Sequence, residues 1–212
     1  MKIIDVPQNS PEWRKVRSGR FTASGMEQII SPTGQQSKQV EKYVNQIIAE
    51  RIICDSATPF KGNANTDRGH SLEDEAADYY AMLTGTEPYR VGVCITDDEF
   101  IGCSPDRFVG EDDYLEIKTC LPHVMVEAYD RENEKEKLEQ EHRPQTQCGL
   151  LVTTRKRAVT MLYCPKMTPI IVYTPRNESY IADMVKYTNE AKSLLIAKTE
   201  RIKNKGYIND IR

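Results

Sequence analysis

A predicted β-hairpin near the middle of the chain constrains the fold more than any other feature. Residues 114–119 alternate in polarity, which predicts a strand with Glu116 and Lys118 on one face and two apolar side chains on the other. A turn-forming stretch at residues 110–113 comes just before this strand and lets the chain double back, so that the polar face lies toward Asp106. The sequence therefore predicts two carboxylates and one ammonium group close together on a sheet.

This convergence of charges indicates a metal site. Partly buried charges are costly unless a partner or a cation is present, and Mg²⁺ prefers a few carboxylates together with waters and substrate phosphates. Lys118 could then orient or activate a water beside the metal, which favours hydrolysis of phosphodiesters. The alternative is that Glu116 and Lys118 only decorate a solvent-exposed strand face, as such a pattern does in many proteins.

Length and composition favour one domain that spans residues 1–212. Of the 212 residues, 39% are hydrophobic and 29% are charged. No apolar run has the length of a membrane span and the N-terminus lacks the apolar core of a signal peptide, so we expect a cytoplasmic location and no membrane partner. The six cysteines form no Cys-x-x-Cys pair, which argues against a zinc site or a simple iron–sulfur site and for reduced thiols.

The charges are separated along the chain. The formal net charge of −3 is not typical of a nucleic-acid-binding protein. However, residues 14–20 and 155–157 form basic runs, whereas residues 67–116 are strongly acidic. This separation is compatible with a basic DNA-binding surface around an acidic reaction centre, although it does not prove either one.

Helical and strand patterns alternate along the chain. Helices are predicted at residues 11–17, 22–30, 37–53, 71–83, 124–143 and 177–204. Pro144 is expected to begin a further helix at residues 145–152. Strands are predicted as a meander at residues 89–96, 100–103, 108–109 and 114–119, followed by strands at residues 158–164 and 170–173. This order predicts an α/β (α+β) fold with a central mixed β-sheet flanked by helices.

Three further groups of polar residues have both a functional and an ordinary interpretation. Glu73 lies in the first turn of a predicted helix, where it can face the sheet edge or simply complement the helix dipole. Arg17 and Ser24 could form a phosphate pocket, or they could be a surface arginine beside a helix N-cap. Gln145 and Gln147 bring two amides to a helix start, and one of them could orient a water or a DNA phosphate.

Five short motifs follow one another through most of the chain. They are Glu12-Trp13 with the run Arg17-Ser18-Gly19-Arg20-Phe21-Thr22-Ala23-Ser24, Arg68-Gly69-x-x-Leu72-Glu73, Ser104-Pro105-Asp106, Leu115-Glu116-Ile117-Lys118 and Gln145-x-Gln147. In this order and at these spacings, they resemble the phage lambda exonuclease, or YqaJ-like viral recombinase, family of the PD-(D/E)xK nuclease superfamily. Each motif alone is a weak signal, but five in order are specific.

The resemblance implies a PD-(D/E)xK nuclease core with a metal site. Asp106 and Glu116 would bind Mg²⁺, with Mn²⁺ as a substitute, helped by the main-chain carbonyl of Ile117. Lys118 would position or activate the attacking water, and Glu73 would support the metal-bound waters.

The resemblance also implies how DNA is bound and cut. Gln147 would sit against the reacting groups, and Arg17 and Ser24 match the positions that hold the 5′-phosphate of a double-stranded DNA end. The implied activity is 5′→3′ degradation of one strand of linear duplex DNA, which leaves a 3′ single-stranded tail for recombination through a single-strand annealing protein. Relatives of this type form a ring-shaped homotrimer, and such an enzyme would work in a bacterial or phage-infected cell.

Two residues depart from the family pattern. Arg107 replaces the usual Gly after Ser-Pro-Asp, so that the turn differs or Arg107 touches DNA, and Thr119 replaces the usual Cys. Neither change removes a catalytic group. The open alternatives are another PD-(D/E)xK endonuclease, which would cut circular DNA, a non-catalytic DNA-end-binding protein, and a metal hydrolase with other substrates.

Overall fold

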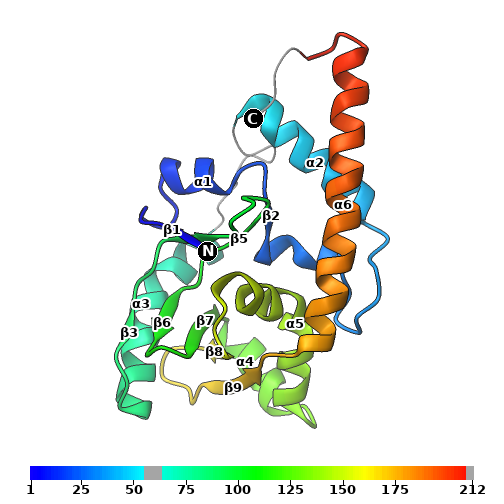
Figure 1. Cartoon of the computed structure of the whole chain (residues 1–212). Coiled ribbons are helices and arrows are strands. Elements are labelled where there is room, and N and C mark those ends of the chain that lie inside the picture. The colour runs from blue at the N-terminus through cyan, green and yellow to red at the C-terminus, as the bar shows by residue number, and fades with distance from the viewer. Residues whose placement is uncertain (55–63, 209–212) are drawn as a thin grey trace.

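The computed structural model of the chain describes residues 1–54 and 64–208, and the side chains of helix α3 from Leu72 onward. The side chain of Arg68, part of the second motif, therefore lies outside the described residues. Two sheets form the centre of the described chain (Figure 1). The predicted α/β class with a central mixed sheet is confirmed.

The larger sheet has five strands, which include the predicted hairpin. Their order is β3 (Pro88–Tyr89), β6 (Arg107–Val109), β7 (Asp113–Thr119), β8 (Arg157–Tyr163) and β9 (Ile170–Pro175). β7 and β8 are parallel, whereas the other neighbouring strands are antiparallel. Gly110, with φ of +53°, helps the chain turn between β6 and β7, because glycine adopts this left-handed conformation without strain.

The smaller sheet brings N-terminal strands beside strands from the middle of the chain. Its order is β1 (Lys2–Ile4), β4 (Val93–Ile95), β5 (Ile101–Cys103) and β2 (Phe21–Thr22). β2 lies parallel to β5, with Thr22 opposite Gly102. This pairing places the segment that follows β2 close to the segment that follows β5.

Helices cover both faces of the larger sheet. The helices are α1 (Pro11–Arg17), the 3₁₀ helix η1 (Ala23–Gln28), α2 (Val40–Ile53), α3 (Ala64–Thr84), α4 (Pro122–Tyr129), α5 (Glu134–Thr153) and α6 (Glu178–Asn204). α3 packs on the face that carries Leu115 and Ile117, and α5 packs near Tyr114 on the other face. The long helix α6 runs along one side of the molecule against α2 (Figure 1).

Capping residues explain where several helices begin and end. The Ser10 hydroxyl accepts a hydrogen bond from the N–H of Trp13 at 3.1 Å, which caps α1. Asn177 caps α6 in the same way through the N–H of Tyr180 at 3.0 Å. Gly85, with φ of +68°, follows the end of α3, as expected for a C-terminal glycine.

The structure corrects four sequence-based expectations. The helix predicted at residues 124–143 is divided into α4 and α5, with residues 130–133 between them. The predicted meander is divided between two sheets, because β4 and β5 pair with β1 and β2, which are distant in sequence. Pro144 does not start a new helix but lies buried inside α5. Proline removes one helical hydrogen bond and can bend a helix without ending it, so its presence alone does not mark a boundary. Helix α3 begins at Ala64 rather than at residue 71.

Within the described ranges, none of the helices combines the length and the hydrophobicity that crossing a membrane requires. All six cysteines lie in the described part and are free thiols, as the sequence predicts, and four of them are buried.

Candidate active site

Asp106 lies where the pairing of β6 with β7 stops. Arg107 is the first residue of β6 and pairs with Leu115, whereas β7 continues to Thr119. Asp106 comes just before β6, and its carboxylate accepts the N–H of Ile117 at 2.6 Å, where a paired strand would otherwise provide the acceptor. Because the N–H and C=O of one strand residue point to the same edge, the Ile117 carbonyl faces the same side as Asp106.

Glu116 and Lys118 lie on the sheet face that α5 covers. Successive strand residues point to opposite faces, so both side chains point away from the α3 side to which Ile117 belongs. The Lys118 ammonium donates to Glu116 Oε1 at 2.9 Å and to Gln145 Oε1 at 3.0 Å. The Gln145 amide in turn donates to the same Glu116 oxygen. The three side chains thus form a closed hydrogen-bonded cluster.

The cluster has an excess of negative charge. Burial, followed by the charges of Glu116 and Glu73, raises the pKa of Asp106 well above its ordinary value, against the lowering effect of the Ile117 N–H and Lys118. Burial acts to lower the pKa of Lys118, but attraction to Glu116 and Asp106 outweighs it, so its pKa is raised. The structure therefore brings Glu73, Asp106, Glu116 and Lys118 into one electrostatic group, in which a cation would relieve the repulsion between the carboxylates.

The donor set fits Mg²⁺. Asp106, Glu116 and the Ile117 carbonyl provide only oxygen atoms, which are the ligands that this ion prefers. Among the side chains that the structure describes, no three of Asp, Glu, His or Cys are grouped closely enough to hold a metal ion by themselves. Waters and a substrate phosphate would have to complete the coordination, which is the usual arrangement for Mg²⁺ at phosphoryl-transfer sites.

Arg17 and Ser24 meet beside this cluster. Arg17 donates to the Ser24 hydroxyl at 3.0 Å and to the Ser104 hydroxyl at 3.1 Å. Its guanidinium lies 4.2 Å from the ring centre of Trp13, and the indole N–H of Trp13 donates to Ser104 at 3.0 Å. The parallel pairing of β2 with β5 brings these segments together. Burial lowers the pKa of Arg17, although an arginine keeps its charge in proteins.

One small hollow joins the arginine cluster to the carboxylate cluster. Its lining includes Arg17, Ser24, Ser104, Glu116 and Gln145. Most of these residues come from separate motifs of the sequence, so the fold brings together groups that are distant in sequence. Arg17 and Glu116 therefore border the same hollow.

Gln147 does not lie where the motif predicts. Its amide donates to the carbonyl of Pro175 at 2.9 Å and accepts the N–H of Asn177 at 2.9 Å, which links α5 to the start of α6. Gln145 is the glutamine that contacts Glu116 and Lys118. Helical residues two positions apart face different directions, so only one of the two amides can reach the cluster.

A sequence model of the YqaJ-like viral recombinase domain matches residues 12–156, which is more than half of the chain. The chain belongs to the YqaJ-like viral recombinase family. The match covers the candidate site from Arg17 to Gln147, and it leaves out β8, β9 and α6. No curated protein sequence matches the chain.

Solved structures share the fold of this family member. An alkaline exonuclease (LHK-Exo) from Laribacter hongkongensis is similar with a TM-score of 0.78 at 22% identity, over 93% of this chain and 98% of that one. The same enzyme in complex with dAMP gives a TM-score of 0.76 at 22% identity, over 93% and 98% of the two chains. A phage-related exonuclease from Haemophilus somnus 129PT gives 0.69 at 13% identity, over 88% and 96%. At these identities, the likeness establishes the nuclease fold.

Sequence reasoning about this family member missed one residue near the cluster. His142 precedes Gln145 by about one turn of α5, and burial together with the charge of Lys118 lowers its pKa. The three histidines have no metal-ligand spacing in the sequence. The signal that could have found His142 is its position three residues before Gln145, because such residues lie on the same face of a helix.

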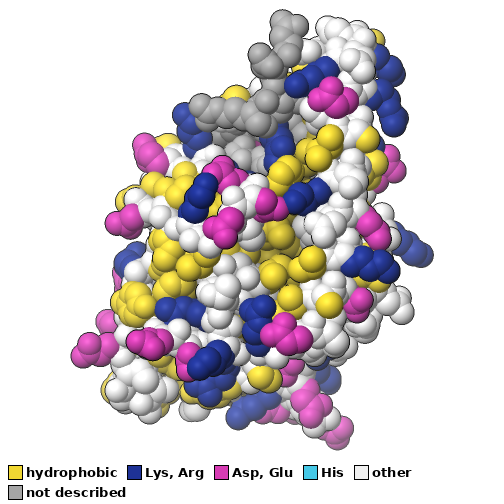
Figure 2. Space-filling view, viewed as in Figure 1, with side chains coloured by type: hydrophobic (Ala, Val, Ile, Leu, Met, Phe, Trp, Pro, Cys, Tyr) yellow, Lys and Arg dark blue, Asp and Glu magenta, His cyan; other side chains and the backbone are white. Residues whose placement is uncertain are grey.

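The second basic run of the sequence is paired with acids of the hairpin turn. Lys156 lies 3.1 Å from Asp112, and Arg157 lies 2.5 Å from Asp113. On the face shown in Figure 2, Lys and Arg side chains are interspersed with Asp and Glu. The separation of charge along the sequence is therefore partly cancelled in space, and the Arg17 cluster is the better-defined basic feature.

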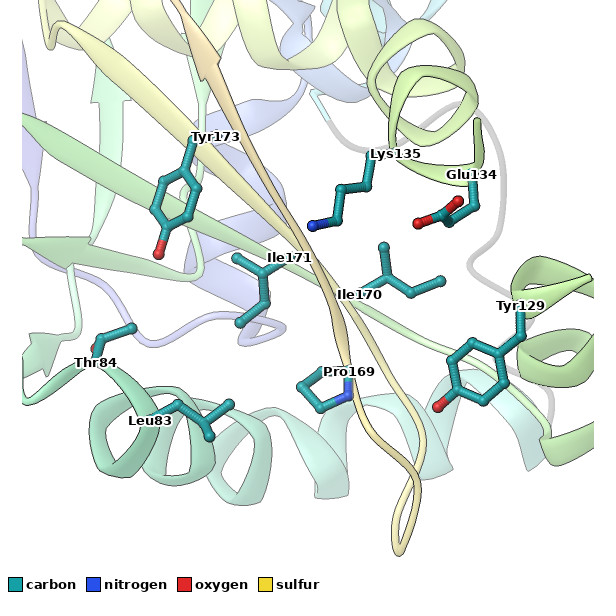
Figure 3. Close-up of a pocket in the computed structure, with 9 residues that line it drawn as sticks. All are labelled: Leu83, Thr84, Tyr129, Glu134, Lys135, Pro169, Ile170, Ile171 and Tyr173. Atoms are coloured by element: carbon teal, nitrogen blue, oxygen red, sulfur yellow. The ribbon is translucent and has the colours of Figure 1, made fainter. Parts of the chain in front are cut away.

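A second hollow shares none of its lining residues with the hollow beside Arg17 and Glu116 (Figure 3). It is lined by the end of α3, the end of α4, the start of α5 and the strand β9, with Leu83, Tyr129, Lys135 and Tyr173 among its residues. None of the predicted site residues lines it, so it does not belong to the candidate active site.

Proposed function

We propose that the chain is a Mg²⁺-dependent exonuclease that degrades one strand of linear double-stranded DNA in the 5′→3′ direction. The observation that carries this proposal is the single hollow shared by Arg17, Ser24, Glu116 and Gln145. A terminal 5′-phosphate held by Arg17 and Ser24 would bring a phosphodiester of the same strand toward Glu116 and Lys118. Family membership and the nuclease fold support a metal-dependent deoxyribonuclease.

The proposed chemistry follows from the geometry of the cluster. Asp106, Glu116 and the Ile117 carbonyl would hold Mg²⁺, which when bound supplies a Lewis acid for the attacking water and the leaving oxygen. Lys118 is fixed by Glu116 and Gln145, so its ammonium can orient the attacking water and stabilise charge on the phosphate. Glu73 would hold further waters from the side of α3.

The two glutamines have different proposed roles. Gln145 orients Lys118 and Glu116 through direct hydrogen bonds, so it touches the reacting groups. Gln147 holds α5 in place through the main chain of Pro175 and Asn177. In this proposal, Gln145 takes the role that the sequence motif predicts for Gln147.

Binding of DNA would depend mainly on phosphate contacts. Arg17 presents a fork of donors that suits a phosphate, and the Ser24 and Ser104 hydroxyls lie within its reach. Such contacts carry no sequence information, so binding should be independent of sequence and should weaken as salt rises.

The wider biological role is part of the same proposal. The 3′ single-stranded tail would serve recombination through a single-strand annealing partner, in the cytoplasm of a bacterial or phage-infected cell. Residues 1–212 would form a single nuclease domain, and three copies would form a ring around DNA. Mn²⁺ would replace Mg²⁺ in the site, since both ions favour carboxylate and water ligands.

Digestion of matched DNA substrates tests the proposal. Linear duplex and closed circular DNA are incubated with the protein and Mg²⁺, and each strand of the linear duplex carries its own label. We expect loss of one strand from each 5′ end, while the circle stays intact and EDTA stops the reaction. Cutting of the circle would indicate an endonuclease instead, and binding of ends without cleavage would indicate an end-binding protein.

A further inference from the structure

Arg107 is a buried arginine that connects two elements of the site. Its side chain is 5% exposed, at the start of β6. One guanidinium nitrogen donates to the main-chain oxygen of Asp106 at 2.5 Å, and another donates to the carboxylate of Asp74 in α3. A planar guanidinium has several donors in a fixed arrangement, so it can bind two acceptors on different elements at once.

The position of α3 makes this connection significant. α3 packs against the sheet face that carries Ile117, whereas Glu116 and Lys118 lie on the opposite face. Glu73 belongs to α3, and its neighbour Asp74 contacts Arg107 at the start of β6. Asp106 and Arg107 lie at this point.

Glu73 and Asp74 are neighbours in α3, and Asp106 and Arg107 are neighbours in the chain at the start of β6. The ion pair between Asp74 and Arg107 therefore holds the backbone of Glu73 near Asp106. Repulsion between the carboxylates of Glu73 and Asp106 would push this part of α3 away from the sheet, and the ion pair opposes this movement.

We propose that Arg107 is a positioning residue that ties α3 to the segment bearing Asp106 and thereby holds Glu73 at the metal site. The inference rests on the proposed function and deepens it at one residue. It also decides between the two expectations for Arg107, because a guanidinium held by Asp106 and Asp74 is not directed at DNA. Arg107 acts through Glu73 and Asp106, and it contacts neither water nor phosphate in the reaction.

The chain provides a matched control for this role. Arg90 also binds Asp74, with distances of 2.5 and 2.6 Å to its two carboxylate oxygens, through a contact that does not involve Asp106. The Arg90 side chain is 65% exposed. Loss of Arg90 removes one positive charge from Asp74 but leaves the link between α3 and Asp106 in place.

Direct metal binding without DNA tests the proposal. Mn²⁺ is titrated into the wild-type protein, Arg107→Gln, Arg107→Lys and Arg90→Gln, with free Mn²⁺ followed by its paramagnetic resonance. We expect Arg107→Gln to weaken Mn²⁺ binding about tenfold, as loss of outer partners of metal ligands commonly does. Arg90→Gln should bind as the wild type does. Arg107→Lys should not restore affinity, because one ammonium cannot serve both acceptors.

Hydrogen exchange gives a second readout on the same proteins. Amides of α3 around Glu73 and Asp74 should exchange faster in Arg107→Gln than in Arg90→Gln. Asp74→Asn cuts the same link at a residue whose side chain is 62% exposed, so it tests the proposal even where Arg107→Gln folds poorly. We expect it to weaken Mn²⁺ binding in the same direction.

Three results would overturn the role of Arg107. The first is wild-type Mn²⁺ affinity and wild-type amide exchange in both Arg107→Gln and Asp74→Asn. The second is an equal loss of Mn²⁺ affinity in Arg90→Gln and Arg107→Gln. The third is wild-type Mn²⁺ affinity in Arg107→Lys, which would show that the positive charge alone matters. Failure of the proposed nuclease function would appear instead in the wild-type protein, as an absence of DNA degradation. The role of Arg107 is therefore tested by Mn²⁺ binding to the variants, whereas the nuclease function is tested by DNA degradation with the wild-type protein.

Discussion

Replacing the two nearby glutamines with alanine should separate catalysis from stability. Gln145 binds the charged groups of Lys118 and Glu116, whereas Gln147 binds only the main chain of Pro175 and Asn177. The two substitutions remove the same chemical group from the same helix. Each variant is therefore the matched control of the other.

The structure gives the size of each effect. Hydrogen bonds to charged groups contribute about 1.5–3 kcal/mol each. Loss of one such contribution from the orientation of Lys118 corresponds to a rate loss of roughly 10- to 100-fold, since about 1.4 kcal/mol is tenfold in rate. For Gln147, which is 1% exposed, alanine leaves two main-chain groups without their partner. Each such group costs about 1–3 kcal/mol, so the free energy of unfolding should fall by roughly 2–6 kcal/mol.

Two assays on both proteins check these values. Single-turnover degradation of a labelled linear duplex reports the chemical step, and denaturant unfolding reports stability. We expect Gln145→Ala to lose rate while it keeps nearly wild-type stability. We expect Gln147→Ala to lose stability while the folded molecules keep nearly wild-type rate. The reasoning is refuted if Gln147→Ala is as stable as the wild type and inactive, or if Gln145→Ala degrades DNA at the wild-type rate.

Two further substitutions probe the cluster and its support. Lys118→Ala should fold and bind DNA ends, but its turnover should fall about 10²- to 10⁴-fold, which is the usual contribution of a positioned proton-transfer group. A wild-type rate in single-turnover assays would show that Lys118 has no part in the mechanism. Tyr114→Phe removes a buried hydroxyl that donates to the Thr146 carbonyl at 2.7 Å. Its free energy of unfolding should fall by about 1–3 kcal/mol with little change in rate, and an unchanged denaturation midpoint would contradict the role of this hydrogen bond.

The local part of the site could be predicted from the sequence. Alternation along residues 114–119 places Glu116 and Lys118 on one face, because the side-chain period of a strand is fixed by its geometry. The turn around Gly110 then determines that Asp106 returns to the same strand. Both conclusions depend on residues that are close in sequence, and the hydrogen bond between Asp106 and Ile117 agrees with them.

The features that could not be predicted depend on distant contacts. The pairing of β2 with β5, which brings Arg17 to Ser104, joins segments separated by about eighty residues, and no local pattern specifies it. The choice between Gln145 and Gln147 depends on the rotation of α5 against the sheet, because both lie in the same helix. Pro144 suggested a helix start that tertiary packing overrides.

The preference for the 5′ end group tests the central claim most directly, since it asks whether the Arg17 cluster and the carboxylate cluster form one site. Initial rates are measured on linear duplexes with 5′-phosphate or 5′-hydroxyl ends, for the wild type, Arg17→Ala and Lys15→Ala, which changes an exposed residue of the same helix. We predict faster degradation of the phosphorylated duplex by the wild type and Lys15→Ala, and loss of this preference in Arg17→Ala. Equal rates on both duplexes with the wild type, or an unchanged preference in Arg17→Ala, would contradict the account.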